Sequence, residues 1–370
     1  MEYFMEVEQV VDQIESLNIM IEDMQNVSHL YRPTNYWAYY EKQFLPELLE
    51  FGLKDFRKRK NSVLSSFGAT DLSPVLFDIR KYRIVSNKFT KKIPGWKVVV
   101  KFLNDRINSL LQGIPNFVND FNFRSFEKAK HFGEIYNAKP IESVEASCIG
   151  NPENIFLVNG HFYTENFLFY YLRYCYCQRF IDFEKISTFV ELGSGSGKQV
   201  ELLFKLYPHT SYLLFDIPPQ LYVCQQYLSA VFPGNVVPYD ITRQWDNIPP
   251  LEPGKIYLFG TQKFPLIQEL KIDLFWNCAS FQEMEPEVVE NYLKFVNVSS
   301  SHVYLYEIMK GKNLAKKEGE HGVLNAVTYD DYQNGLKSFD LVDYSNPLST
   351  GSNNLRKEYI ESFWTKCAEI

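Results

Sequence analysis

At its centre the chain reads Phe189-Val190-Glu191-Leu192-Gly193-Ser194-Gly195-Ser196-Gly197, an apolar run with a carboxylate near its end, followed by three glycines at alternate positions. This pattern predicts a buried strand that turns tightly into a helix. Glycines permit positive φ and let a ligand approach the backbone amides without meeting a Cβ. Nineteen residues after Gly197, Asp216 closes a second apolar run, where a carboxylate meets ribose hydroxyls in a doubly wound sheet. Together the two features predict a nucleotide-like ligand.

Downstream of the glycines, strands and helices alternate, which predicts a parallel βαβ sheet. We expect strands at residues 188–192, 212–216, 235–239, 270–276 and 302–307, and helices at residues 199–207, 220–231 and 285–296. A further helix is expected at residues 329–337. Two final apolar runs, residues 339–344 and 359–364, are joined by a polar connection with no room for a helix. They predict an antiparallel pair at the edge of the sheet.

Upstream of the sheet the pattern is mainly helical. Residues 7–24 carry an amphipathic stripe, residues 97–111 have helical periodicity, and an aromatic-rich helix is expected at residues 165–179. Turn signals gather at Gly150-Asn151-Pro152 and Asn159-Gly160, and we place a domain boundary there to within about ten residues. The expected organisation is a helical domain, residues 1–150, for substrate enclosure or oligomerisation, and a ligand-binding domain, residues 151–370. A homo-oligomer is compatible with the acidic amphipathic N-terminal helix.

The composition of the chain argues against several classes of protein. The chain has 370 residues, of which 45% are hydrophobic and 16% aromatic, so a large core is expected. The net charge of −7 argues against a general nucleic-acid binder, which needs a basic face. No apolar stretch approaches the ~20 residues of a membrane span, and the acidic start does not read as a secretory signal. The six cysteines form no paired clusters; reduced core thiols in a cytoplasmic protein are the favoured interpretation.

The spacing of the three glycines narrows the class of ligand that the motif is expected to bind. The third glycine comes two positions after the second, whereas a dinucleotide fingerprint places it three positions on. This layout resembles the S-adenosylmethionine-dependent methyltransferases. The segment Phe215-Asp216-Ile217-Pro218-Pro219-Gln220-Leu221-Tyr222 and its continuation to Ser229 are similar to the putative sugar O-methyltransferase family of bacterial surface-polysaccharide genes. The resemblance covers roughly residues 130 to 310. It implies a class I Rossmann-like α/β fold, with a seven-stranded, mostly parallel sheet whose last strand is antiparallel, and methylation of a carbohydrate hydroxyl.

The resemblance also implies which residues hold the donor. Glu191 would offset its ammonium, Asp216 would accept from the ribose hydroxyls, and Asp240 would accept from the adenine amino group, although a solvated turn aspartate is nearly as well supported. The full set of expected S-adenosylmethionine-binding residues is Glu191, Gly193, Ser194, Gly195, Gly197, Asp216, Ile217, Asp240, Ile241 and Asn277.

Catalysis requires aligned reactants and one proton acceptor. Glu283, which follows the fourth expected strand, is our first candidate, although it also fits a carboxylate stabilised by a helix N-terminus. His321, in the loop Gly319-Glu320-His321-Gly322, is the best-placed histidine, although an ordinary loop histidine is the better-supported description, and Glu307 is the third candidate. Glu283 and Glu307 could hold Mg²⁺, but metal is not favoured and no metal ligand is assigned. The rival functions are an N- or phenol O-methyltransferase and a non-catalytic cofactor-binding partner subunit.

Overall fold

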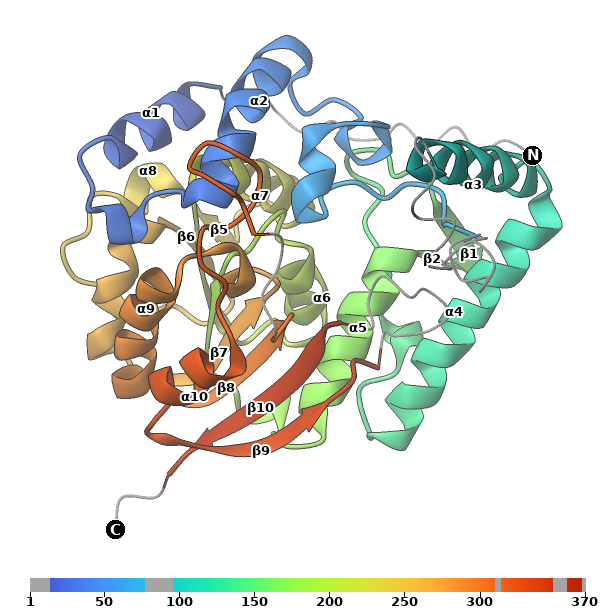
Figure 1. Ribbon diagram of the computed structural model, residues 1–370. Helices are drawn as coiled ribbons and strands as arrows, with labels where there is room; N and C mark the ends of the chain where they lie inside the picture. Colours follow the sequence, from blue (N-terminus) through green and yellow to red (C-terminus); the bar gives the residue numbers. More distant parts are fainter. Residues whose placement is uncertain (1–13, 77–95, 310–313, 349–357, 368–370) are drawn as a thin grey trace.

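The computed structural model describes residues 14–76, 96–309, 314–348 and 358–367. Its centre is an eight-stranded sheet with the order β5-β6-β4-β3-β7-β8-β10-β9, in which β10 runs antiparallel to both of its neighbours, β8 and β9, and the other strands are parallel (Figure 1). The strands are β3 (Thr188–Leu192), β4 (Ser211–Asp216), β5 (Val236–Val237), β6 (Ile256–Gly260), β7 (Ile272–Cys278), β8 (Ser300–Glu307), β9 (Phe339–Ser345) and β10 (Ile360–Lys366). The expected α/β class, mostly parallel sheet and antiparallel end are confirmed.

Helices cover both faces of this sheet. They are α5 (Glu165–Gln178), α6 (Lys198–Leu206), α7 (Pro218–Val231), α8 (Tyr239–Thr242), α9 (Pro286–Ser299) and α10 (Tyr329–Gly335). Alternate residues of one strand enter opposite cores: Leu214 packs in the cluster with α5, α6 and α7, and Leu213 in the cluster with α9 and α10. Because both faces are buried, the strands read as continuous apolar runs rather than alternating ones.

The short strand expected near residues 235–239 is present as β5, but the strand β6 was not predicted. The strand beside β4 is β6, whereas β5, within the expected range 235–239, is two residues long and lies at the sheet edge. β6 makes this an eight-stranded sheet instead of the expected seven. The sequence does hold a signal for it, since Ile256-Tyr257-Leu258-Phe259 is an apolar run bounded by the Pro253-Gly254 turn and Gly260.

The first part of the chain is mainly helical, as expected. It contains α1 (Ile14–Met24), α2 (Asn35–Phe51), α3 (Trp96–Gln112) and α4 (Pro115–Ile135), with short 3-10 turns that include η3 (Val63–Phe67). The amphipathic stripe predicted from residue 7 is described only from Ile14 onward, and residues 7–13 lie outside the described residues. Leu17 of α1, Phe44 of α2 and Phe126 of α4 belong to the same buried cluster as α6 and α7. These segments therefore share one core with the sheet.

The turn signals near residue 150 form a small hairpin. β1 (Ile155–Val158) and β2 (His161–Thr164) pair antiparallel through Asn159 and Gly160, which have φ of 51° and 88°. Such a turn favours Asn-Gly because both central residues take positive φ. None of the described helices combines the length and apolarity needed to cross a membrane.

Candidate functional site

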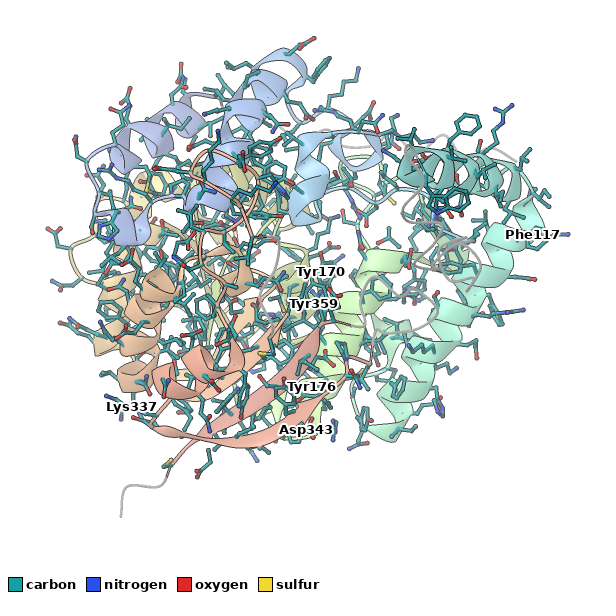
Figure 2. The ribbon with its side chains drawn as sticks, viewed as in Figure 1. Phe117, Tyr170, Tyr176, Lys337, Asp343 and Tyr359 are labelled. Atoms are coloured by element: carbon teal, nitrogen blue, oxygen red, sulfur yellow. The ribbon has the colours of Figure 1, made fainter. Side chains whose placement is uncertain are left out.

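A cavity of about 230 Å³ lies at the carboxyl ends of β3, β4 and β7. Its inner wall comes from the glycine loop after β3 and from Asp216, and its outer wall from Trp37 of α2, Tyr170 of α5 and Tyr359 next to β10. Tyr170 and Tyr359 lie close together in Figure 2. This is the crevice at which ligands bind in open parallel sheets. A smaller cavity adjoins it and shares Trp37, Gly193 and Asp216.

The glycine loop has the conformation that the motif predicts. Gly193, Gly195 and Gly197 have φ of 80°, 56° and 78°. A Cβ on Gly193 would lie 2.3 Å from Ser280 Oγ, and one on Gly197 would lie 2.8 Å from Leu228. Side chains are therefore excluded on steric as well as conformational grounds. The amides of the three glycines hold the loop in shape, since they donate to Phe215 O, Asp216 Oδ2 and Ser194 O.

Glu191 is a buried carboxyl on the cavity wall, and its Oε2 atom has no hydrogen-bond partner. Burial, and then the neighbouring charge of Asp216, raise its pKa to about 8, against the opposing effect of Arg173. A buried polar atom without a partner is costly in a folded protein. A cationic group in the cavity would give Oε2 a partner and favour the ionised carboxylate.

Asp216 is held at the end of β4 by backbone donors. Its Oδ2 accepts from Gly195 N at 2.7 Å and its Oδ1 accepts from Ile217 N at 2.8 Å, while Ser194 Oγ lies 3.5 Å from Oδ2. Burial raises the pKa of Asp216 to about 7 despite these bonds. Ile217 lines the smaller cavity with Thr261. Asp216 is thus positioned at the junction of the two cavities.

Arg173 is a cavity residue that the sequence did not reveal. It is the single basic residue of the aromatic helix α5. Its guanidinium lies 4.4 Å from the ring centre of Tyr306 and 5.2 Å from that of Tyr170. Its Nε is buried without a hydrogen-bond partner. The cavity thus presents a cation and a carboxyl within electrostatic range of each other, a suitable pair for an amino-acid zwitterion.

Of the predicted catalytic residues, only Glu283 lies on the cavity wall, where it is buried. Glu307 lies behind it and its Oε2 accepts from Gln282 N at 3.1 Å. Asn277, expected to bind the cofactor, instead ties two loops together: its Nδ2 donates to Leu192 O at 2.8 Å and its Oδ1 accepts from Phe281 N at 3.0 Å. Both side chains brace the site from outside the two cavities. Among the described residues, no group of three or more His, Cys, Asp or Glu is placed to hold a metal ion.

Three other predicted site residues lie away from the cavity. Asp240 and Ile241 are exposed on α8, after the edge strand β5, and Ile241 is 49% exposed. Their expected role depended on a third strand next to β4, a place that β6 occupies instead. His321 does not line the cavity; its Nε2 lies 3.0 Å from the Tyr40 hydroxyl of α2.

A segment that is distant in sequence from the glycine loop forms part of the cavity wall, and we call it the strap. Within this strap (residues 62–71), Ser66, Phe67 and Gly68 line the cavity. Lys198, the first residue of α6, donates to Gly68 O at 3.0 Å and to Asp71 Oδ2 at 2.6 Å. The strap is therefore fastened to the helix that follows the glycine loop.

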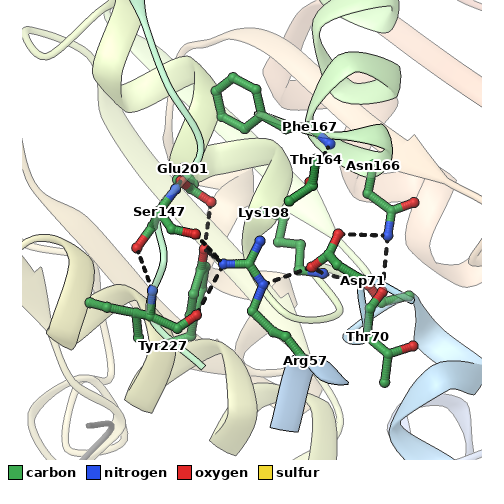
Figure 3. A network of polar contacts seen from close by, with 12 residues as sticks. Arg57, Thr70, Asp71, Ser147, Thr164, Asn166, Phe167, Lys198, Glu201 and Tyr227 are labelled. Atoms are coloured by element: carbon green, nitrogen blue, oxygen red, sulfur yellow. Dashed lines mark hydrogen bonds and ion pairs between the residues drawn. The ribbon is translucent and has the colours of Figure 1, made fainter. Parts of the chain in front are cut away.

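The contact between Lys198 and Asp71 belongs to a buried network of polar side chains (Figure 3). Arg57 Nε donates to Asp71 Oδ2 at 2.7 Å, and its Nη1 donates to Ile149 O at 3.0 Å and to the Tyr227 hydroxyl at 3.2 Å. The Tyr227 hydroxyl in turn donates to Glu201 Oε2 at 2.6 Å. This network connects the strap to both α6 and α7.

Comparison with known proteins links part of this site to one enzyme class. Residues 176–240, which contain β3, the glycine loop and Asp216, match the family model of an O-methyltransferase domain. No curated protein matches the chain.

Solved structures with some similarity include the pyocyanin biosynthetic protein PhzM, which is 14% identical with a TM-score of 0.36 over 55% of each chain. The mitomycin 7-O-methyltransferase MmcR is 11% identical with a TM-score of 0.36, over 53% of this chain and 57% of that one. Magnesium protoporphyrin IX methyltransferase from Synechocystis PCC 6803, with bound SAM, is 12% identical with a TM-score of 0.34, over 50% and 72%. The matches thus span little more than half the length of the first two proteins.

Proposed function

We propose that this chain is an S-adenosylmethionine-dependent O-methyltransferase whose acceptor is a carbohydrate hydroxyl. The observation that carries the proposal is the acidic and the basic side chain that line the cavity without hydrogen-bond partners for one atom each. Glu191 Oε2 and Arg173 Nε are buried and without hydrogen-bond partners beside a loop that only glycines can form. A molecule that joins an amino-acid zwitterion to a nucleoside complements this wall, and the match of residues 176–240 to an O-methyltransferase domain supports the same ligand.

Each part of the donor has a partner in this arrangement. Glu191 would hold the ammonium, Arg173 the carboxylate and Asp216 the ribose hydroxyls, and Ile217 follows Asp216 on the wall of the smaller cavity. When bound, S-adenosylmethionine supplies an electrophilic methyl group. The two charged side chains and Asp216 would fix its orientation, and Ser66, Phe67 and Gly68 of the strap would lie beside it.

The outer wall suits a sugar. Trp37, Phe67, Tyr170 and Tyr359 supply aromatic rings, which offer flat apolar faces together with polar edges, and Asn166 adds an amide. Glu283 is the cavity carboxylate that we assign as proton acceptor for the reacting hydroxyl. The region 1–150, which we propose as an enclosing domain, contributes Trp37 and the strap. A phenolic acceptor would also fit aromatic walls, and the acceptor experiment below separates the two.

The donor assignment is tested by calorimetry with two ligands. S-adenosylhomocysteine carries the amino acid, and methylthioadenosine lacks it. We expect Glu191→Gln and Arg173→Gln each to weaken S-adenosylhomocysteine binding about tenfold or more, because a hydrogen bond to a charged group contributes roughly 1.5–3 kcal/mol. Both variants should bind methylthioadenosine like the wild type, whereas Asp216→Asn should weaken both ligands. Glu290→Gln on the exposed face of α9 is the control. Equal losses for both ligands in the Glu191 and Arg173 variants would contradict the assignment.

The acceptor is tested by turnover. Purified protein with methyl-labelled S-adenosylmethionine is incubated with separate pools of nucleotide sugars, oligosaccharides, phenols and amines. We expect label on a sugar oxygen. Label on a phenol or an amine alone would refute the carbohydrate assignment, and donor binding without transfer to any pool would identify a non-catalytic partner subunit instead.

A further inference from the structure

His321 lies outside the cavity, yet it is connected to the cavity wall through α2. Its Nε2 lies 3.0 Å from the Tyr40 hydroxyl, and its ring centre lies 5.0 Å from that of Tyr36. Tyr36 and Tyr40 share a side-chain hydrogen bond. Tyr36 is also within electrostatic range of Glu283, which lines the cavity. The order from cavity to surface is therefore Glu283, Tyr36, Tyr40 and His321.

The start of α2 is hydrogen-bonded both to the backbone of Glu283 and to the loop of His321. Thr34 Oγ1 donates to Glu283 O at 2.8 Å. Asn35 Nδ2 donates to Glu320 O at 2.9 Å and to Gly322 O at 2.7 Å, and Gly319 N donates to Asn35 Oδ1 at 2.8 Å. Thr34, which precedes α2, is thus bonded to the segment that carries Glu283, and Asn35, the first residue of α2, is bonded to the loop that carries His321. This double attachment holds the two tyrosines in place between the carboxylate and the imidazole.

We propose that Tyr36, Tyr40 and His321 form a proton relay that carries the proton accepted by Glu283 from the cavity wall to solvent. The relay rests on the proposed function, since it serves a reaction that releases one proton at Glu283. Glu283 and Tyr36 are buried, whereas His321 is partly exposed. Histidine is the side chain that ordinarily gains and loses a proton between pH 5 and 8, which suits the solvent end of such a path.

The proton balance is simple. The acceptor O–H bond breaks and its proton passes to a Glu283 oxygen. Glu283 passes a proton to the Tyr36 oxygen as Tyr36 gives its own to Tyr40 and Tyr40 gives its own to His321 Nε2. His321 then releases one proton to water, so one proton leaves and each tyrosine ends neutral. Burial, and then the charge of Glu283, raise the pKa of Tyr36, which keeps it from resting as a tyrosinate and favours this linked transfer.

Other titratable or charged groups border the relay, and the relay variants leave them unchanged. They are Asp216 and Tyr359 near Glu283 and Tyr36, Tyr39 against the His321 ring, and Lys317 and Glu320 in the loop of His321. Tyr39 offers a matched control, because its ring centre lies 5.3 Å from that of His321, the same distance as that of Tyr40.

The experiment measures steady-state methyl transfer, because the relay acts after Glu283 has accepted the proton of each turnover. Tyr40→Phe and His321→Ala are expected to lower kcat about tenfold while the single-turnover rate and S-adenosylhomocysteine affinity stay unchanged, and Tyr39→Phe should keep the wild-type kcat. Added imidazole should restore most of the kcat of His321→Ala and none of that of Tyr40→Phe. If Tyr40→Phe fails to fold, Tyr36→Phe carries the same comparison.

Two outcomes overturn the relay and are distinguishable. Wild-type kcat values in Tyr40→Phe and His321→Ala, or imidazole that restores neither or both variants equally, overturn the relay and leave the proposed function standing. A wild-type protein that transfers no methyl group to any acceptor overturns the proposed function, and the relay falls with it.

Discussion

Replacing Asp71 with alanine is expected to lower the free energy of unfolding by about 3–5 kcal/mol, a large share of the total stability of a typical protein. Asp71 is the carboxylate partner of two buried cations, Arg57 at 2.7 Å and Lys198 at 2.6 Å. Burial alone would raise the pKa of Asp71, but the charges of Arg57 and Lys198 outweigh it and lower the pKa to about 2. Alanine would leave Arg57 charged and buried without that counter-charge.

Urea unfolding of wild type and Asp71→Ala measures this loss. Glu290→Ala, which breaks the exposed pair with Lys294, is the control and should change stability by under about 1 kcal/mol. Because the pKa of Asp71 is depressed in the folded state, its contribution is present above about pH 4 and is lost as the pH falls toward about 2. An Asp71→Ala variant as stable as the control would contradict the importance of the network.

Local sequence patterns were sufficient to predict the strands at the centre of the sheet. β3 has the predicted bounds, and β4 and the glycine turn follow within a residue, because apolar runs and glycines act over a few positions. β6 was missed although its signal is of the same kind. Asp240 and Ile241 follow the edge strand β5 and lie outside the two cavities, whereas Thr261, which follows β6, lines the smaller one.

The closing parts of the site depend on contacts that local patterns do not encode. Lys198 meets Asp71 across 127 positions of sequence, and the hydroxyl of Tyr40 meets His321 across 281. Arg173 follows the helical pattern of an aromatic segment, and only the fold turns it toward Glu191. Glu191, the glycines and Asp216, which form the inner wall of the cavity, could be singled out from the sequence, whereas the strap and the outer wall required the structure.

Binding of S-adenosylhomocysteine should tighten by up to about tenfold per pH unit between about pH 6 and about pH 7.5. Burial raises the pKa of Glu191 to about 8, so in the empty cavity this carboxyl is mostly protonated at neutral pH. The ligand ammonium favours the ionised carboxylate, and each binding event therefore releases a proton. Rising pH removes that proton in advance, which raises the affinity until the pH passes the pKa of the empty site. Asp216, with a pKa near 7, adds a smaller release if the ribose hydroxyls also favour its ionised form.

Calorimetry in buffers of different ionisation enthalpy counts the released protons directly. We expect about one proton at pH 7 for the wild type and for Asp216→Asn, and far fewer for Glu191→Gln. The glutamine keeps the shape of the side chain and cannot ionise, so its weak affinity should stay nearly constant over the same pH range and approach that of the wild type at the acidic end. A wild-type affinity that does not vary with pH would mean that Glu191 does not face the ammonium, because a buried carboxyl cannot ionise against a bound cation without giving up its proton.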